Sequence, residues 1–295
     1  MKKMVFIVNP CSGKVKIKNS LLDVVSNFNS AGYDIRICTT QYQGHATEIV
    51  SELEENATDI IAVSGGDGTL NEVITGLLRS GKNIPIGYIP AGSTNDFATT
   101  LALPLDIKKA AKGIVFGSAH TIDVGVFNAE RYFSYIASFG MFTSVSYNTP
   151  QVAKNTFGHM AYVFEGMKDF ANVVPYNVRV ETDEAVYEGK YVFGSVTNTT
   201  SVGGIVKLDS SLVKMNDGVF ETVLVKMPES INDLNKIILG LSNSKFDDSV
   251  FEFIKSKQVK LTFENDVNWS LDGEHHKSGK EVVIENLKRA VTIVK

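Results

Sequence analysis

The sequence is poor in cysteine and has no long apolar run. Its 295 residues include two cysteines, Cys11 and Cys38. Two cysteines cannot build a disulfide framework or a cysteine-rich zinc site, which favours a reducing, cytoplasmic compartment. The apolar run Met4–Val8 stops at Asn9 and is too short for the core of a signal peptide. No other segment reaches the roughly 18 apolar residues that a membrane-spanning helix needs.

A strong charge of one sign is also lacking. Lysine and arginine total 29 against 33 aspartate and glutamate, and the resulting charge of −4 argues against a general nucleic-acid binder. Hydrophobic residues make up 43% and charged residues 21%, which excludes a chain that is disordered throughout. The length suits two domains better than one. We therefore expect a cytoplasmic protein of two domains, without a nucleic-acid partner or a transmembrane segment.

Short apolar runs alternate with helical patterns in the first third of the chain. The apolar runs predict strands at residues 4–8, 33–39, 60–63, 84–89 and 121–126. Helical spacing of apolar residues predicts helices at 20–28, 46–53, 70–78 and 107–116. This alternation predicts an α/β domain with a doubly wound parallel sheet. Ligands of such sheets bind beyond the carboxyl ends of the strands.

The pattern changes to a strand-rich one near residue 125. Strands are expected at residues 132–139, 176–181, 186–196, 219–225, 259–263 and 282–284, and helices near 160–170 and 231–239. We expect a nucleotide-binding domain over residues 1–125 and a β-rich, sandwich-like domain over 126–295. The last strand could pack back toward the first domain.

Three glycine-bearing loops follow the first, third and fourth predicted strands. They are residues 9–14, 64–69 and 90–97, and the parallel sheet would bring all three to one edge. Each loop alone also suits an ordinary turn or helix cap, which is the better interpretation of the first loop taken singly. Three such loops on one edge favour a nucleotide site.

The second loop carries the strongest signal. Gly65, Gly66 and Gly68 are three glycines within four positions, and they cost conformational entropy to order. The helix predicted just after them would offer free N–H groups to a phosphate. Asp67 would repel that phosphate unless a metal ion lay between them, and Mg²⁺ commonly bridges a carboxylate and nucleotide phosphates.

The motifs together resemble the diacylglycerol kinase catalytic family, which includes bacterial soluble lipid kinases and the sphingosine and ceramide kinases. They are Asn9-Pro10-Cys11-Ser12-Gly13-Lys14, Gly65-Gly66-Asp67-Gly68-Thr69 with Asn71-Glu72, Gly92-Ser93-Thr94-Asn95-Asp96-Phe97, Asn216-Asp217-Gly218 and Leu271-Asp272-Gly273-Glu274. The resemblance implies an ATP-dependent kinase that phosphorylates a lipid hydroxyl, with diacylglycerol favoured as the substrate. It also implies an active site in the cleft between an α/β nucleotide domain and a β-rich domain.

The resemblance also implies roles for individual residues. The catalytic residues would be Glu274, Asp272, Asp67 and Asp96, with Mg²⁺ organised by Asp67 and Asp96 and one of the other two acids acting as the base. The residues around ATP would be Asn9, Pro10, Cys11, Ser12, Gly13, Thr40, Gly66, Asp67, Gly68, Thr69, Leu70, Asn71, Glu72, Ser93 and Asn95. A second, structural metal would be held by Asp217 and the backbone carbonyls of Lys214 and Val219.

Some assignments stay open at the level of sequence. Asp272-Gly273 and Asp217-Gly218 are each compatible with a plain hairpin turn. Family analogy favours Glu274 as the base, but the residues themselves do not divide the roles of Asp272 and Glu274. Lipid substrate would be presented at the inner membrane surface, which the enzyme would visit transiently, and a homodimer is compatible with the sequence. Two other functions remain: a kinase of a soluble substrate, NAD or a sugar phosphate, because NAD kinases carry a similar glycine loop, and a non-catalytic lipid- or nucleotide-binding regulator.

Overall fold

The fold is described from a computed structural model of the chain. The structure describes residues 1–141, 174–202, 206–208, 211–243 and 245–295. The helix expected near residues 160–170 lies outside these ranges. The chain divides into two compact units, the first comprising Met1–Val124 with Arg289–Lys295 and the second Gly125–Lys288.

The first unit is built on a parallel sheet. Its strands are β1 (Lys2–Val8), β2 (Tyr33–Thr39), β3 (Ile60–Gly65) and β4 (Ile86–Pro90). They are ordered β2-β1-β3-β4, and every pair along this order is parallel. The carboxyl ends of all four strands therefore lie at one edge of the sheet, as the sequence predicts.

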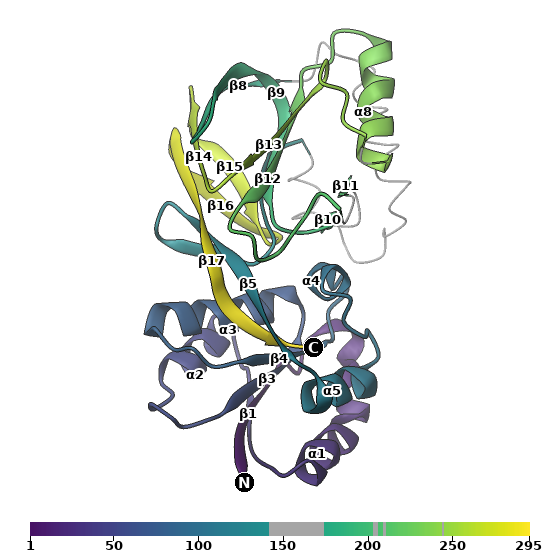
Figure 1. Cartoon of the computed structure of the whole chain (residues 1–295), viewed down its shortest axis with the longest axis vertical. Coiled ribbons are helices and arrows are strands. Elements are labelled where there is room, and N and C mark those ends of the chain that lie inside the picture. The colour runs from purple at the N-terminus through teal and green to yellow at the C-terminus, as the bar shows by residue number, and fades with distance from the viewer. Residues whose placement is uncertain (142–173, 203–205, 209–210, 244) are drawn as a thin grey trace. The chain divides into compact units, whose positions relative to one another are not determined.

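Helices cover both faces of this sheet, as Figure 1 shows. One face carries α1 (Leu21–Ser30) and α5 (Ile107–Phe116), and the other carries α2 (His45–Ser51) and α3 (Asp67–Ser80). Met4, Phe6 and Val8 of β1 pack in one cluster with side chains of α1 and α5. The short helices η1 (Gly13–Asn19) and α4 (Asp96–Thr100) and the first part of the strand β5 (Ala119–Phe127) complete the unit. The predicted doubly wound α/β layer is confirmed.

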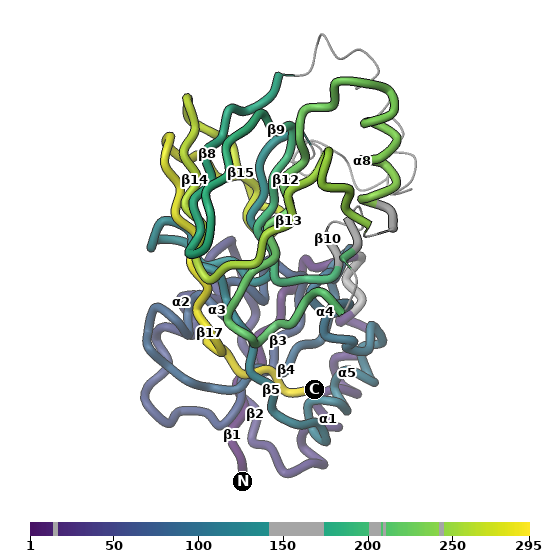
Figure 2. The backbone as a smooth tube through the Cα atoms, turned by 45° about the horizontal axis from the view of Figure 1, so that its top comes forward, coloured from purple at the N-terminus to yellow at the C-terminus, as the bar shows by residue number. Residues whose placement is uncertain are grey.

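The second unit is dominated by antiparallel strands, many of which are labelled in Figures 1 and 2. They are β6 (Arg131–Phe133), β7 (Ile136–Gly140), β8 (Tyr176–Thr182), β9 (Val186–Thr197), β12 (Phe220–Lys226), β13 (Phe251–Ser256), β14 (Gln258–Phe263), β15 (Val267–Leu271), β16 (Glu274–Ser278) and β17 (Glu281–Val294). The short strands β10 (Ser201–Val202) and β11 (Val206–Lys207) pair with each other. One described helix, α8 (Ile231–Asn243), packs its buried side chains with those of β12 and β13.

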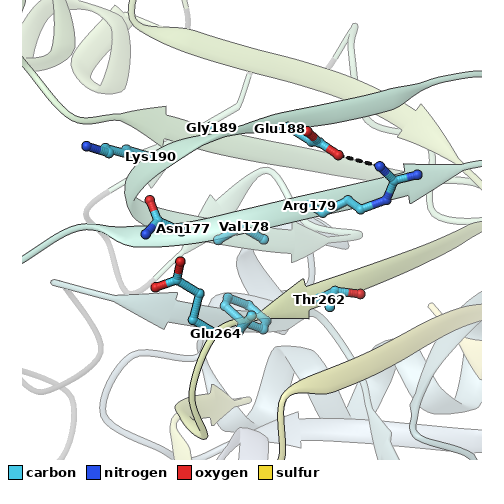
Figure 3. Close-up of a pocket in the computed structure, with 9 residues that line it drawn as sticks. Asn177, Val178, Arg179, Glu188, Gly189, Lys190, Thr262 and Glu264 are labelled. Carbon is cyan, nitrogen blue, oxygen red and sulfur yellow. Dashed lines mark hydrogen bonds and ion pairs between the residues drawn. The ribbon is translucent and has the colours of Figure 1, made fainter.

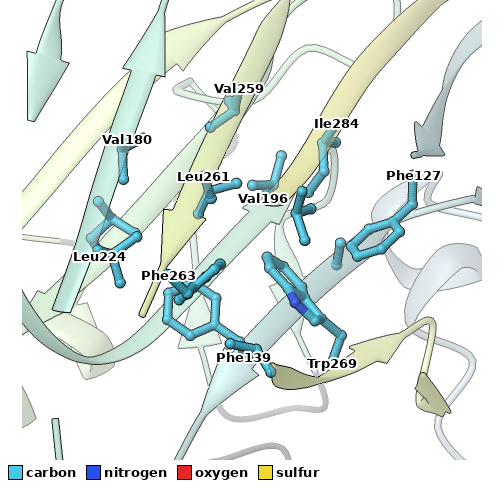
Figure 4. Close-up of a cluster of buried hydrophobic side chains, with 14 of the residues drawn as sticks. Phe127, Phe139, Val180, Val196, Leu224, Val259, Leu261, Phe263, Trp269 and Ile284 are labelled. Atoms are coloured by element: carbon cyan, nitrogen blue, oxygen red, sulfur yellow. The ribbon is translucent and has the colours of Figure 1, made fainter. Parts of the chain in front are cut away.

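The core of the second unit is aromatic. Trp269 is fully buried and lies within 5.0 to 6.1 Å, ring centre to ring centre, of Phe127, Phe139 and Phe263. Figure 4 shows these rings gathered with the aliphatic side chains of the neighbouring strands. Edge-to-face and tilted aromatic contacts of this kind add to the stabilisation from burial alone. The single tryptophan is therefore a core residue.

A prediction of one continuous strand over residues 132–139 is wrong. The structure has two strands there, β6 and β7, separated by Ser134 and Tyr135. The backbone leaves the ladder at this point because the N–H groups of Ser134, Tyr135 and Ile136 donate to the Asp272 carboxylate instead. Local hydrophobic patterning cannot reveal a partner so distant in sequence.

The last strand, β17, pairs with strands of both units. Gln258–Thr262 of β14 pair with Glu281–Glu285, whereas Ile293 and Val294 pair with β4. At Arg289, between these two segments, the backbone adopts a left-handed conformation with φ of 53°. The Arg289 N–H donates to Oδ1 of the fully buried Asp123 at 2.7 Å. Residues 126–295 were predicted as one domain, and the grouping of Arg289–Lys295 with the first unit follows from this pairing with β4.

Candidate functional site

Three loops of the first unit meet at the carboxyl edge of the parallel sheet. Asn9 Nδ2 donates to Thr69 Oγ1 at 2.8 Å, which joins the loop after β1 to the loop after β3. The Gly66 N–H donates to Ser12 Oγ at 3.2 Å and links the same two loops a second time. The Ala91 N–H donates to the Gly65 carbonyl oxygen at 2.8 Å and brings in the loop after β4.

Glycine is required where these loops touch. A Cβ atom on Gly92 would lie 2.7 Å from the Gly66 Cα, and one on Gly13 would lie 2.4 Å from the Ala91 carbonyl oxygen. Both distances are shorter than non-bonded contacts allow, and Gly13 also has a positive φ of 28°. The backbones can therefore approach each other only because side chains are absent, and the result is a surface of partly exposed main chain at which phosphate oxygens could bind.

Asp67 lies at the centre of this surface, on the first turn of α3. Its Oδ2 accepts the Asp96 N–H at 3.1 Å and the Thr94 hydroxyl at 3.5 Å, and its Oδ1 accepts the Tyr88 hydroxyl at 3.4 Å. Burial, together with the negative charge of Asp96, raises the pKa of Asp67 to about 6. Among the residues that the structure describes, no lysine or arginine pairs with Asp67.

Two adjacent buried carboxylates form a donor set that suits Mg²⁺. This ion is commonly bound by one or two carboxylates and otherwise by waters and substrate phosphates. Asp67 and Asp96 are 9% and 5% exposed, and a cation would relieve the cost of burying their charges together. Within the described ranges, no group of three or more metal-binding acid, histidine or cysteine side chains is present.

Several residues expected around the nucleotide hold the loops in shape. The Glu72 carboxylate accepts the N–H groups of Gly44 and Ala46 at 2.8 and 3.2 Å, at the start of α2. Asn95 has a left-handed backbone, and its side chain accepts from and donates to Gly92 within its own loop. The Leu70 side chain is fully buried in the core.

The remaining expected residues lie at the same edge. Thr40 follows β2, is 8% exposed and donates its N–H to the Val8 carbonyl oxygen. Pro10 and Cys11 are exposed on the first loop, where the Cys11 N–H donates to Asn9 Oδ1. Ser93 is exposed on the third loop, and Gly68 and Asn71 lie in the first two turns of α3.

Asp272 and Glu274 occupy the hairpin between β15 and β16 in the second unit, and the structure gives them different surroundings. Asp272 is 7% exposed and accepts three backbone N–H groups, from Ser134 at 2.5 Å and from Tyr135 and Ile136 at 3.0 Å each. Its backbone is left-handed, with φ of 49°, and Gly273 follows with φ of 87°. Asp272 and Gly273 therefore form the turn of the β15–β16 hairpin, and the Asp272 carboxylate joins this turn to the segment between β6 and β7.

Glu274 is the more accessible of the two acids. Its side chain is 37% exposed, and Oε2 accepts from Arg131 Nη2 at 3.1 Å. Arg131 Nη1 lies 3.3 Å from His276 Nδ1. Sequence reasoning did not single out Arg131, because a lone arginine beside an apolar strand carries no local signal. It did not find Tyr88 either, because a tyrosine in an apolar strand is indistinguishable from a core residue.

The residues expected to hold a second metal lie in the segment before β12. Asp217 Oδ1 accepts the Val219 N–H at 3.2 Å across Gly218, whose φ is 88°. Nearby, Glu221 is fully buried, and within the described part of the chain neither of its carboxylate oxygens accepts a hydrogen bond of good geometry. An ion pair joins its Oε1 to Lys255 Nζ at 3.2 Å. Burial raises the pKa of Glu221 to about 7, with a contribution from the charge of Asp217.

A concave surface of the second unit lies away from these residues. A pocket of about 520 Å³ lies over β8, β9 and β14, as Figure 3 shows. Charged side chains rim it, and Arg179 pairs there with Glu188. None of the residues expected to take part in catalysis lines this pocket. Its lining is Asn177, Val178, Arg179, Glu188, Gly189, Lys190, Thr262, Phe263 and Glu264.

Comparison with known proteins places this geometry in a family. The model of the diacylglycerol kinase catalytic domain matches residues 3–127. The diacylglycerol kinase of Bacillus subtilis (strain 168) is 36% identical over 278 residues, covering 93% of this chain and 90% of the relative. That of Staphylococcus saprophyticus is 33% identical over 276 residues, covering 93% and 89%.

Solved structures agree with the sequence comparisons. A diacylglycerol kinase crystal structure from Bacillus anthracis aligns over 99% of this chain and 96% of its own, with a TM-score of 0.78 and 25% identity. A second structure from the same organism aligns with a TM-score of 0.81 and 28% identity, covering 99% of this chain and 95% of that one. The chain therefore belongs to the diacylglycerol kinase family.

Proposed function

We propose that this protein is a lipid kinase that transfers the γ-phosphate of ATP to the free hydroxyl of diacylglycerol, giving phosphatidic acid. The observation that carries the proposal is the meeting of three glycine loops around the buried carboxylate of Asp67. In the reaction, a bond forms between the lipid oxygen and the γ-phosphorus while the bond to ADP breaks. Such transfers depend on positioning and charge neutralisation far more than on covalent help from the protein.

The glycine loops would bind the nucleotide phosphates through main-chain N–H groups. The start of α3, which follows Gly66, adds the positive end of its helix dipole. Ser12 and Thr69 stabilise the arrangement by tying the first two loops together. Asn95 and Glu72 support the loops from behind, so their substitution would reduce nucleotide binding indirectly.

Asp67 and Asp96 would hold Mg²⁺ at this site. When bound, the ion would neutralise charge on the phosphate oxygens. The ionised form of Asp67 is the one that binds a cation. Because its pKa is raised to about 6, a more acidic solution would reduce the ionised fraction.

Glu274 is the better candidate for the base that accepts the proton of the lipid hydroxyl. Its carboxylate is accessible, whereas both oxygens of Asp272 accept backbone N–H groups. A positioned base contributes roughly 10²- to 10⁴-fold to such a reaction. We assign Asp272 the task of fixing the β15–β16 turn that carries Glu274.

A second cation would be held by Asp217 and the carbonyl oxygens of Lys214 and Val219, as the family resemblance implies. The oxygen donors suit a hard cation. The buried, poorly satisfied carboxylate of Glu221 supports a nearby positive charge, since Lys255 is the one described residue that pairs with it. The cation would stiffen the segment that leads into β12.

Lipid substrate would reach the enzyme at a membrane surface. Among the described residues, no helix is long and apolar enough to cross a bilayer. Diacylglycerol is insoluble in water, so the enzyme would have to act where the lipid headgroup region is exposed.

The test is phosphate transfer from radiolabelled ATP to a panel of lipids, with separation of the products by thin-layer chromatography. We expect label in phosphatidic acid, with strong losses for Asp67→Asn and Glu274→Gln. The exposed Asp266→Asn variant is a matched control, because Asp266 forms a surface ion pair with Lys277. No transfer to any neutral glycerolipid or sphingoid base would refute the proposal. Formation of NADP from NAD would instead indicate a soluble substrate, and nucleotide binding without turnover would indicate a regulator.

A further inference from the structure

Arg131 on β6 is a charged residue to which the proposed reaction assigns no role. Its guanidinium contacts Glu274 through Nη2 at 3.1 Å and His276 through Nη1 at 3.3 Å. One hydrogen bond joins Arg131 to Glu274, although a guanidinium and a carboxylate can form two parallel hydrogen bonds. Both side chains are 37% exposed. An arginine is thus held directly against the proposed base, within reach of solvent.

The guanidinium retains binding capacity. It has five N–H donors in a planar fork, and the contacts with Glu274 and His276 account for two of them within the described part of the chain. A planar fork with free donors matches the geometry of phosphate oxygens. Because the Arg131 side chain is 37% exposed, a second anion can reach the donors that remain.

His276 orients the guanidinium without neutralising its charge. Burial lowers the pKa of His276, and the positive charge of Arg131 lowers it further. A neutral imidazole can accept the Arg131 N–H at Nδ1, which assigns the ring proton to Nε2. The ring itself is fixed by an edge-to-face contact with Phe127, at 5.2 Å between ring centres. Arg131 therefore contacts a neutral partner, His276, through one nitrogen and a carboxylate, Glu274, through another, and a different anion could take the place of that carboxylate.

We propose that Arg131 binds the phosphoryl group during transfer and the phosphate of the product, replacing its contact with Glu274 by contacts with phosphate oxygens. The inference rests on the proposed function, in which Glu274 takes up the hydroxyl proton. Once protonated, Glu274 is neutral and attracts Arg131 far less. At the same moment the lipid oxygen acquires a phosphate with about two negative charges. The guanidinium of Arg131 then contacts the new negative charge on the product phosphate in place of the carboxylate of Glu274.

The experiment compares the binding of two short-chain lipids, dioctanoyl phosphatidate and dioctanoylglycerol, which differ only in the phosphate. We expect Arg131→Gln to weaken phosphatidate binding roughly 10- to 100-fold, the range for lost hydrogen bonds to a charged group, and to leave dioctanoylglycerol binding within about twofold. Arg131→Lys should keep part of the affinity for phosphatidate. Glu274→Gln should bind phosphatidate at least as tightly as the unaltered enzyme, because a competing anion is gone.

The matched control is Arg179→Gln, which removes another arginine of the second unit that pairs with carboxylates at the surface. It should bind both lipids unchanged. Equal losses for the two lipids in Arg131→Gln, or no loss for either, would overturn the proposal and leave Arg131 as a residue that only positions Glu274. If Arg131→Gln does not fold, the same comparison with Arg131→Lys decides. Turnover by the unaltered enzyme tests the proposed function separately, so the two failures are distinguishable.

Discussion

Replacing Asp272 with asparagine should destabilise the protein, whereas replacing Glu274 with glutamine should stop the reaction without destabilising it. Asparagine keeps the preference for the left-handed backbone that residue 272 adopts, with φ of 49°, so the turn itself is preserved. What changes is the side chain. One of the two acceptor oxygens becomes an NH₂ group that faces a backbone N–H, and the negative charge is lost.

The size of the effect follows from the contacts. Asp272 accepts three backbone N–H groups while 7% exposed. A hydrogen bond to a charged group contributes about 1.5–3 kcal/mol, and a buried donor left without an acceptor costs about 1–3 kcal/mol. Because the remaining carbonyl oxygen can still accept two N–H groups, we expect Asp272→Asn to lose about 2–4 kcal/mol of unfolding free energy. Glu274→Gln breaks one partly exposed ion pair and should change the unfolding free energy by less than about 1 kcal/mol.

Urea unfolding of both variants, measured beside phosphate transfer, tests this separation. Glu274→Gln should fold like the unaltered protein and lose roughly 10²- to 10⁴-fold in turnover. Asp266→Asn again serves as the control for a surface carboxylate. If Asp272→Asn were as stable as the unaltered protein and yet inactive, Asp272 would take part in the chemistry, and the division of roles argued from these contacts would be refuted.

Gly92→Ala should weaken ATP binding in a direct binding assay, because the added Cβ would collide with the neighbouring loop. Gly113→Ala should instead stabilise helix α5 by about 0.5–1 kcal/mol, because no atom lies within 4 Å of the added Cβ. Thr69→Val should lower the thermal midpoint slightly, because Asn9 loses its 2.8 Å acceptor and with it about 1 kcal/mol. Glu221 has a folded-state pKa of about 7, above its ordinary 4.5, so the stability that its protonated form contributes is present at low pH and is lost as the pH rises through about 7. With divalent cations removed by EDTA, the unaltered protein should lose about 3 kcal/mol of unfolding free energy between about pH 5 and about pH 8. The Glu221→Gln variant should lose little over the same range. Equal losses in the two proteins would contradict the raised pKa of Glu221.

The elements that sequence predicts well are those specified by their own residues. The strand Tyr33–Thr39 and the helix Ile107–Phe116 have the predicted bounds, because β-branched runs and helical spacing of apolar residues are local signals. Helix α3 starts at Asp67, three residues before the predicted start, because the glycine loop itself forms the first turn. The break between β6 and β7 was not predictable, since Asp272, which causes it, lies 138 residues from Ser134 in sequence.

The candidate site follows the same division. Parallel strands bring the ends of β1, β3 and β4 together, so the meeting of the glycine loops could be predicted from their order alone. The tasks of single side chains could not. Glu72 and Asp67 both follow glycine-rich sequence. The Glu72 carboxylate accepts main-chain N–H groups at the start of α2, whereas the Asp67 carboxylate lies among the glycine loops. Arg131 became visible only through its distance to Glu274.

The pairing of β17 with β4 sets an order of events during synthesis. The ribosome delivers β1 to β4 early, but the open side of β4 has no strand beside it until Ile293 and Val294 have been made. A nascent first unit therefore presents unpaired N–H and carbonyl groups of a buried, apolar strand for most of the time that translation takes. We expect this interval to be the one in which the growing chain depends most on chaperones, and removal of the last seven residues, Arg289–Lys295, to make it permanent.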